Sequence, residues 1–417
     1  MSGSQGISQP QRGGLRIALQ DDSIEAKRNR VYHPGDLLTG SIHFDNAGPL
    51  EACHVLVSFE GIMRTWVDME NYISAVQYVF LRQSQAIPQQ EQVMHVAEGV
   101  RLYSMPFKFR IASQCFPNDD WNSQLSMLPP TFENGEASVD RQGKRCMQPL
   151  IQYTIRATAV FRNRPKAQLL KCQASRDILF TPWTDACPPL SVDDFPGEFQ
   201  MTTTQDVRRR LLRTHLGRIT LSSCEPQPLP MFSDGSIGRT QGMLQIRATL
   251  CSEQPYKSRL PPPRWSCEVH LDLVRHVHSS TMPMKEVAST RLMRLNKYLR
   301  LRNETVHSES WKVDPLWWNQ RNMRQSTALA SFEATIPFAI RPQSKLVPTF
   351  ASPLSSVRYS IRVQLRFSEI AHAPLFVEVP LQVYYRRRGD ERLDSPRDSV
   401  STSVDALDSA LPPSYYL

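Results

Sequence analysis

The feature that most limits the fold of this chain is a strict alternation of apolar and polar residues in short runs. One face of "IQYTIRATAVF" collects Ile151, Tyr153, Ile155, Ala157, Ala159 and Phe161. One face of "VRYSIRVQLRF" collects Val357, Tyr359, Ile361, Val363, Leu365 and Phe367. A period of two places successive side chains on opposite faces of a β-strand, so each run predicts a strand with one buried face.

Alternating runs of this kind continue along most of the chain, and they are bounded by Pro, Gly, Asn or Ser. Further examples are "HVLVSFEG", "MPFKFRI", "MLQIRATL", "CEVHLDL" and "LFVEVPLQVYY". Short strands separated by turn residues are typical of antiparallel β-sandwiches. We therefore expect an all-β fold with helix below about 10% of residues. The best helix candidates are residues 206–216 and 290–302.

Three kinds of element recur in the same order in the two halves of the sequence. The first half has "MPFKFRI", "LPPTF" and "IQYTIRATAVF", and the second has "TIPFAIR", "LVPTF" and "VRYSIRVQLRF". This repetition predicts two tandem β-sandwiches. We expect a disordered N-terminus at 1–14, sandwiches at 15–182 and 211–385, a Pro-rich linker at 183–210, and a disordered tail at 386–417.

Catalysis, metal binding and cofactor binding are not expected from the sequence. The chain has no glycine-rich nucleotide loop, no nucleophile elbow and no zinc-protease motif. Its eight cysteines include no Cys-x-x-Cys pair, so we expect reduced and mostly buried thiols in a cytosolic protein. No apolar run is long enough to span a membrane.

The formal net charge of +9 raises the question of an anionic partner. Basic residues are concentrated in two places, which together hold Arg208, Arg209, Arg210, Arg213, Arg386, Arg387 and Arg388. These arginines are candidates for contact with anionic lipid headgroups. The alternative is a solvated basic face, and nucleic-acid binding is not expected.

The tail carries Pro412, Pro413, Ser414 and Tyr415, which match the Pro-Pro-x-Tyr ligand of WW domains. Paired prolines hold a left-handed extended helix before binding, so little entropy is lost in an aromatic groove. The tyrosine ring fills a second pocket, and its hydroxyl makes a directional polar contact. Pro412, Pro413 and Tyr415 are therefore the candidate binding residues.

The chain resembles the arrestin family, specifically the α-arrestins. The resemblance covers roughly residues 15–385 and rests on "VYHPGDLLTGSI", "VLVSFEGI", "GVRLYSMPFKFRI", "LPPTFE" and "YTIRATAVF" in the first half. In the second half it rests on "IPFAIRP" and "RYSIRVQLRF". It implies two tandem arrestin-like, immunoglobulin-type β-sandwiches. A long insertion before Leu128 departs from the family pattern, and the sequence does not locate a buried charged cluster that senses phosphate.

The resemblance also implies a function for the tail motif. In α-arrestins such motifs recruit HECT-type ubiquitin ligases that carry WW domains. The expected function is a cytoplasmic adaptor that brings such a ligase to a membrane transporter or receptor for ubiquitination and endocytosis. The alternative is an arrestin-fold sorting coat or receptor-signalling scaffold without ligase recruitment. Candidate ubiquitin acceptors on the protein itself are Lys27, Lys166, Lys171 and Lys345.

Overall fold

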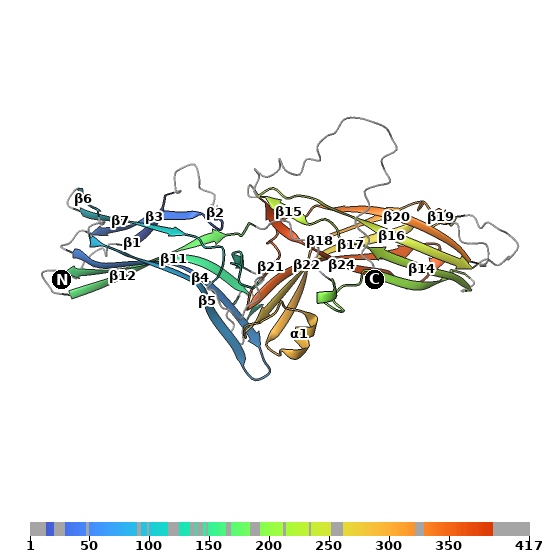
Figure 1. The fold of residues 1–417 in the computed structure, drawn as a ribbon, viewed down its shortest axis with the longest axis horizontal. Coiled ribbons are helices and arrows are strands. Elements are labelled where there is room, and N and C mark those ends of the chain that lie inside the picture. Colours follow the sequence, from blue (N-terminus) through green and yellow to red (C-terminus); the bar gives the residue numbers. More distant parts are fainter. Residues whose placement is uncertain are drawn as a thin grey trace, which may run out of the picture.

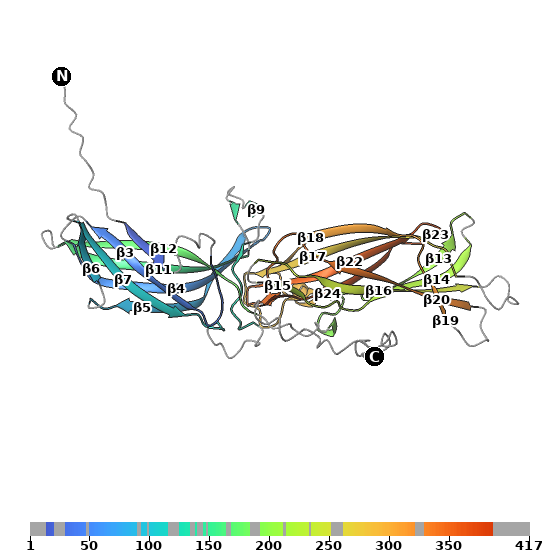
Figure 2. The ribbon, with the colours of Figure 1, turned by 90° about the horizontal axis from the view of Figure 1, so that it is seen from above.

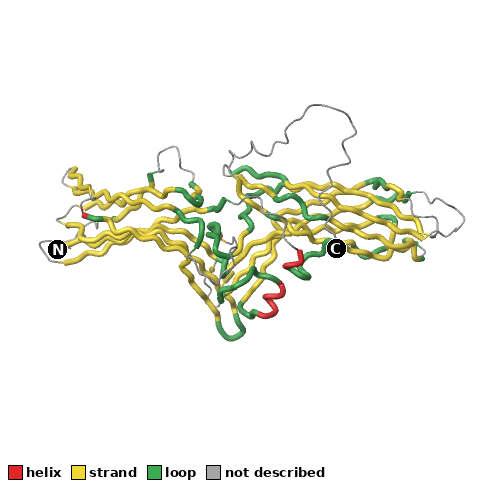
Figure 3. Tube along the Cα trace, viewed as in Figure 1, coloured by secondary structure: helices red, strands yellow, loops and turns green. Residues whose placement is uncertain are grey.

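The chain folds almost entirely into β-strands, which confirms the all-β expectation. The computed structural model describes residues 14–20, 30–46, 50–89, 93–97, 100–115, 125–133, 138–139, 145–146, 149–163, 168–183, 192–211, 214–232, 235–251, 262–321 and 329–386. Its strands form two groups that lie end to end along the long axis (Figure 1). Helix is confined to short pieces of the trace (Figure 3).

The first sheet group contains the strands that precede residue 181. Its strands are β1 (Leu15–Leu19), β2 (Val31–Tyr32), β3 (Leu37–Asn46), β4 (Leu50–Asp68), β5 (Ile73–Ile87), β6 (Val93–Ala97), β7 (Val100–Arg110), β8 (Phe132–Glu133), β9 (Ser138–Val139), β10 (Arg145–Cys146), β11 (Leu150–Asn163) and β12 (Gln168–Phe180). One sheet has the order β1-β3-β7-β6, and the other has the order β2-β12-β11-β4-β5 with β8 on β11. Strands β9 and β10 pair separately.

The second sheet group follows a short 3₁₀ turn, η2 (Val192–Asp194). It contains β13 (Thr202–Arg209), β14 (His215–Ser223), β15 (Leu229–Phe232), β16 (Thr240–Cys251), β17 (Cys267–Ser280), α1 (Thr290–Leu295), β18 (Leu299–Val313), β19 (Asn319–Arg321), β20 (Leu329–Ile340), β21 (Phe350–Ala351), β22 (Ser355–Phe367), β23 (Ile370–Ala371), β24 (Leu375–Leu381) and β25 (Val383–Arg386). The orders are β19-β20-β16-β14-β13-β23 and β18-β17-β22-β21, with β24 on β22 and β15 on β25.

Every strand pairing in the described part of the chain stays within one sheet group. In the first group the two larger sheets face each other, because the ring of Phe44 on β3 stacks on that of Phe161 on β11 with centroids 3.9 Å apart. The apolar faces anticipated on residues 151–161 and 357–367 are buried throughout. Alternation therefore predicted correctly which face of each strand enters the core.

The repeated sequence elements occupy corresponding places in the two groups. The Tyr153 hydroxyl donates to the carbonyl oxygen of Pro129 at 2.6 Å, and the Tyr359 hydroxyl donates to that of Val347 at 2.9 Å. Each acceptor lies three residues before the phenylalanine of the repeated Pro-Thr-Phe. The two tyrosines hence tie the same turn to the same strand position.

The threonines of the repeated turns make a second matched set of bonds. The Thr131 amide donates to the Phe180 carbonyl at 2.8 Å, and the Thr131 hydroxyl accepts from the Phe180 amide at 2.8 Å. The Thr349 amide donates to the Val383 carbonyl at 2.8 Å, and the Thr349 hydroxyl accepts from the Val383 amide at 3.0 Å. Both threonines thus make the same pair of bonds to one residue of a neighbouring strand, which is the last residue of β12 in the first group and the first residue of β25 in the second.

A glycine faces a phenylalanine at one matched register position in each group. Gly40 on β3 is opposite Phe107 on β7, and Gly242 on β16 is opposite Phe338 on β20. A Cβ atom at either glycine would overlap the phenylalanine ring. Both positions therefore require glycine for close packing.

The two sheet groups meet where the repeated turns approach each other, and we call this contact the junction. The Phe132 and Phe350 rings are edge-to-face, with centroids 6.1 Å apart. Near the tip of the β4–β5 hairpin, the Thr65 hydroxyl donates to the Ser280 carbonyl at 2.6 Å. Figure 1 shows this hairpin reaching past β21 and β22 toward α1. The junction consequently combines apolar packing with direct polar contacts.

Two helix expectations from the sequence need correction. The described residues within 206–216 are not helical, because β13 runs to Arg209 and β14 begins at His215. Within 290–302 the helix covers α1 alone, and β18 begins at Leu299. Strand β13 lies inside the expected linker 183–210. In both helix candidates arginine or lysine residues are interspersed with leucine, a composition that both helices and exposed strands accept.

The cysteines also differ in part from the expectation. Cys115 and Cys267 are buried, and burial raises the pKa of each thiol to about 12. Cys224 and Cys251 are exposed, and Cys172 is half-buried. Burial therefore keeps only two of these five thiols away from solvent and dissolved oxidants.

Candidate functional site

The tail motif and several other candidate residues lie outside the described residues. They are Pro412, Pro413, Tyr415, Arg213, Arg387, Arg388, Lys27 and Lys166. The roles assigned to these residues from the sequence stay predictions.

The described candidate arginines do not form one patch. Arg208, Arg209 and Arg210 are exposed where β13 turns toward β14. Arg386 belongs to β25, which pairs with β15. Figure 2 shows β13 and β23 near the end of the second group that is far from the junction, whereas β15 is close to the junction. The two concentrations of basic residues therefore lie in different parts of the second group.

The two described candidate lysines differ in their surroundings. Lys171 is exposed on β12. Lys345 is exposed in the loop before β21, and its ammonium nitrogen lies 4.9 Å from the centre of the Tyr385 ring. Although the residue as a whole is exposed, partial burial of its ammonium group lowers the pKa of Lys345. Lys345 lies beside the strand from which the tail continues, and Lys171 belongs to the first sheet group.

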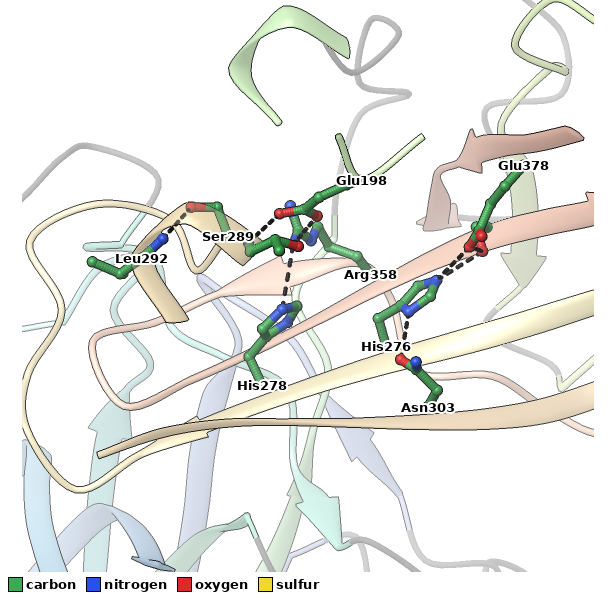
Figure 4. A network of polar contacts seen from close by, with 10 residues as sticks. Glu198, His276, His278, Ser289, Leu292, Asn303, Arg358 and Glu378 are labelled. Carbon is green, nitrogen blue, oxygen red and sulfur yellow. Dashed lines mark hydrogen bonds and ion pairs between the residues drawn. The ribbon is translucent and has the colours of Figure 1, made fainter. Parts of the chain in front are cut away.

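A buried polar network that the sequence analysis did not find lies on the outer face of β17, β22 and β24 (Figure 4). At its centre the Arg358 guanidinium donates to the Glu198 carboxylate at 2.8 Å. The two side chains are only 4% and 11% exposed, respectively. The Phe195 ring covers the guanidinium, with 4.1 Å between Cζ and the ring centre. A charge pair is therefore enclosed between a strand and the segment that connects the two sheet groups.

The same carboxylate also contacts the start of α1. Glu198 accepts a hydrogen bond from the Thr290 amide, and the Ser289 hydroxyl accepts one from the Leu292 amide at 3.1 Å. These acceptors satisfy backbone N–H groups that a helix N-terminus leaves without a partner. We call the group of Glu198, Arg358, Phe195 and the Thr290 amide the clasp.

His278 lies beside the clasp and is neutral near pH 7. Its Nε2 is 3.4 Å from an Arg358 nitrogen, an arrangement in which Nε2 accepts. Burial lowers the pKa of His278 well below its usual value, and the charge of Arg358 lowers it further. Three buried atoms here have no hydrogen-bond partner among the described residues: His278 Nδ1, Ser356 Oγ and Arg358 Nη1.

A second part of the network surrounds Glu378 on β24. Its carboxylate accepts from the Ser360 hydroxyl at 2.6 Å and is 3.0 Å from the Arg362 Nε. His276 joins the network, with its Nε2 2.7 Å from the Ser360 hydroxyl and 3.5 Å from Glu378. Burial raises the pKa of Glu378, but the hydrogen bonds from His276 and Ser360 and the Arg362 charge outweigh it, so the pKa is lowered.

Gln200 fastens the connecting segment to the same sheet. Its amide donates to the Glu378 carbonyl at 2.9 Å, and its carbonyl accepts from the Glu378 amide at 2.9 Å. Residues 195–200 are therefore attached twice to the second sheet group, once through the clasp and once through this bridge. The network positions backbone segments, and it presents no cysteine or lysine nucleophile.

The sequence contained only a partial signal for this network. Alternation placed Arg358 and Arg362 on the polar face of their strand, which is correct. It could not show that residues 195–200 cover Arg358, because that contact joins positions 160 residues apart. In the described part of the chain no group of three or more His, Cys, Asp or Glu is arranged to hold a metal ion.

Comparison with known proteins gives no identification. No protein-family model matches the chain, and no curated protein matches it either. None of the helices that the structure describes is long and apolar enough to cross a membrane.

Proposed function

We propose that this chain is an adaptor of the α-arrestin type, in which two tandem arrestin-like, immunoglobulin-type β-sandwiches carry a ligase-binding tail. Two kinds of observation support the body of this proposal. The sequence resemblance covers both halves, and the repeated elements make matched contacts in both sheet groups. Matched bonds at matched positions are expected when one folding unit occurs twice.

The observation that carries the functional part is the sequence Pro412-Pro413-Ser414-Tyr415. Its partner in the proposal is a WW domain of a HECT-type ubiquitin ligase. Pro412 follows Arg386, the last residue of β25, by 26 positions (412 − 386). At about 3.6 Å per residue this length allows a reach of at most about 90 Å. A ligase held at the motif is therefore close enough to act on the body or on a bound cargo.

The cargo of the proposed adaptor is a membrane transporter or receptor, and the adaptor acts from the cytoplasm at the plasma membrane or endosomes. Arg208, Arg209 and Arg210 offer positive charge for anionic headgroups, each contributing about 1 kcal/mol near such a surface. Leu211 follows them and is 94% exposed. An exposed apolar side chain beside three arginines suits a lipid surface better than charge alone does.

Modification of the adaptor itself is part of the proposal. The candidate acceptors are Lys27, Lys166, Lys171 and Lys345. The ammonium of Lys345 packs over Tyr385, next to the last described residue of the body. Its lowered pKa increases the fraction of neutral amine, which is the form that attacks a ubiquitin thioester.

A pull-down tests the ligase contact. The full chain and a variant lacking residues 411–417 are compared for capture by an immobilised tandem of WW domains, with Tyr416→Ala as the matched control. We expect capture by the full chain and by Tyr416→Ala, and none by the truncated variant. Equal capture of all three would contradict ligase recruitment and would favour a sorting coat or signalling scaffold with the same body.

A further inference from the structure

We propose that the clasp is a releasable connection: when Glu198 leaves Arg358, α1 comes apart, together with the contacts that the residues directly after α1 make with the β4–β5 hairpin, while both sheet groups stay folded. This inference does not depend on the ligase proposal. It rests on three observations: the clasp is buried, few other contacts stabilise α1, and the residues directly after α1 contact the β4–β5 hairpin.

The clasp contains the charge pair of Glu198 and Arg358. The net contribution of this pair to stability is small, but its disruption is costly. Taking two charges out of water costs several kcal/mol per ion, and their attraction roughly offsets that cost. Arg358 Nη1 is buried without a hydrogen-bond partner among the described residues, so its desolvation is not fully compensated. Without Glu198, the buried guanidinium has an uncompensated charge. The cover over it must then open to admit water.

That cover consists of short segments with little core of their own. Helix α1 has six residues, fewer than an isolated helix needs to be stable in water. Its Leu292 and Met293 pack against a small cluster of Met284, Ala288 and Leu299, which is separate from the main core. Helix α1 consequently depends on the Glu198 carboxylate and on this small cluster for its stability.

Helix α1 leads directly into the part of the junction formed by the hairpin tip. The Tyr298 and Tyr72 hydroxyl oxygens are 3.4 Å apart, and an Arg300 nitrogen donates to the Met69 sulfur at 3.7 Å. Tyr298 follows the C-cap of α1 by two residues. Movement of α1 therefore moves one side of this contact.

The strands beneath the clasp have independent support. Strand β17 pairs with β18 and β22 along its whole length, and β22 also pairs with β24. Their inner faces belong to the main core. Local opening of segments with few buried contacts needs much less free energy than opening of such strands. Release of the clasp is hence a local event.

Hydrogen exchange on the full chain tests this inference. The variants are Glu198→Gln, which keeps the shape and removes the charge, and the double variant Glu198→Leu with Arg358→Met, which removes both charges. Asp206→Asn is the control, because Asp206 pairs with Arg218 on the exposed surface of β13. Exchange is followed at the backbone amides of residues 289–299 and of Met69 at the hairpin tip. The Met69 amide donates to the backbone carbonyl of Tyr72.

In Glu198→Gln, exchange at residues 289–299 should be at least ten times faster, with a smaller acceleration at Met69. Exchange in β16 and β20 should stay as in the wild type. The double variant should exchange more slowly than Glu198→Gln at these positions, because no buried charge is left without a partner. It should still exchange faster there than the wild type, because the Thr290 amide has lost its acceptor. Asp206→Asn should change none of these rates.

Two results would overturn the proposal. The first is unchanged exchange at residues 289–299 in Glu198→Gln. The second is an equal acceleration in α1 and in the strands, which would make the pair an ordinary contributor to global stability. The wild type gives an independent test if a variant does not fold. In low urea its α1 amides should exchange through an opening that precedes global unfolding, and exchange of all elements in a single step would contradict the inference.

Discussion

The two sheet groups share the repeated turns and the strand pairing around the repeated tyrosines, which is β5-β4-β11-β12 in the first group and β18-β17-β22-β24 in the second. They differ at two register positions beside these tyrosines. Opposite Tyr153, β4 has Gly61, and opposite Tyr359, β17 has Arg275. The residue before each tyrosine also differs, with Gln152 in the first group and Arg358 in the second. Both differences replace a small or neutral residue with a cation.

The difference between Gly61 and Arg275 changes what each group packs against at this position. At Gly61 a Cβ atom would overlap Phe80, so the first group fills the space with its own aromatic ring. In the second group Arg275 pairs with Glu304 at 2.6 Å, and its guanidinium lies 5.8 Å from the centre of the Phe132 ring. The first group thus closes on itself, whereas the second reaches across the junction to its neighbour.

The difference between Gln152 and Arg358 determines which sheet is covered on its outer face by the connecting segment. Gln152 remains half-buried on its sheet. Arg358 instead binds Glu198 and so holds the connecting segment down. At these two positions the second group therefore uses cations to contact the first group and the connecting segment, where the first group has Gly61 and Gln152.

The largest expected effect separates the two phenylalanines of the repeated turns. Phe132 is 3% exposed, whereas Phe350 is only partly buried. Phe132→Ala should lower the free energy of unfolding by about 3–5 kcal/mol, and Phe350→Ala should cost clearly less. Urea denaturation of both variants measures the difference. An equal loss in the free energy of unfolding for the two variants would contradict the expected difference between the two turns.

The tyrosine hydroxyls should, in contrast, behave alike. Tyr153→Phe and Tyr359→Phe each leave a carbonyl without the hydroxyl that it accepts from. An unpaired buried acceptor costs about 1–3 kcal/mol, so each variant should lose a similar amount in that range. Differential scanning calorimetry of the two variants checks this. A loss in only one variant would break the structural equivalence of the two groups.

The smallest expected effect concerns pH and the second group alone. Because burial lowers the pKa of His278, the folded chain holds fewer protons there than the unfolded chain does below about pH 6.5. The free energy of unfolding is therefore not reduced by His278 above that pH, and it decreases as the pH falls below it, by up to about 1.4 kcal/mol per pH unit. The groups facing His278 are Arg358 and His276.

His278→Gln should flatten the dependence of stability on pH between about 6.5 and 5, which denaturation at several pH values can measure. Glu378 contributes in a separate, lower window. Its lowered pKa gives stability that is present above the usual carboxyl pKa and is lost as the pH falls further. A wild-type slope retained by His278→Gln would assign the proton uptake to another group.

The sequence predicted the all-β class and the buried face of its long strands, because a period of two is a local property. It also predicted the repeated turns, whose phenylalanine and tyrosine stand out in short motifs. It did not predict the clasp, since Glu198 and Arg358 are far apart in the chain and each is ordinary in its own segment. It also misassigned residues 206–216, where local composition suits either structure and pairing with β14 decides the outcome.

We propose that this body carries a ligase-binding motif whose key residue is Tyr415. The most direct measurement titrates the full chain against an isolated WW domain and compares Tyr415→Ala with Tyr416→Ala. Wild type should bind in the micromolar range, about −8 kcal/mol. Tyr415→Ala should lose about 2 kcal/mol, roughly a 30-fold loss of affinity, whereas Tyr416→Ala should bind like the wild type. Equal affinities for the two variants would contradict the claim.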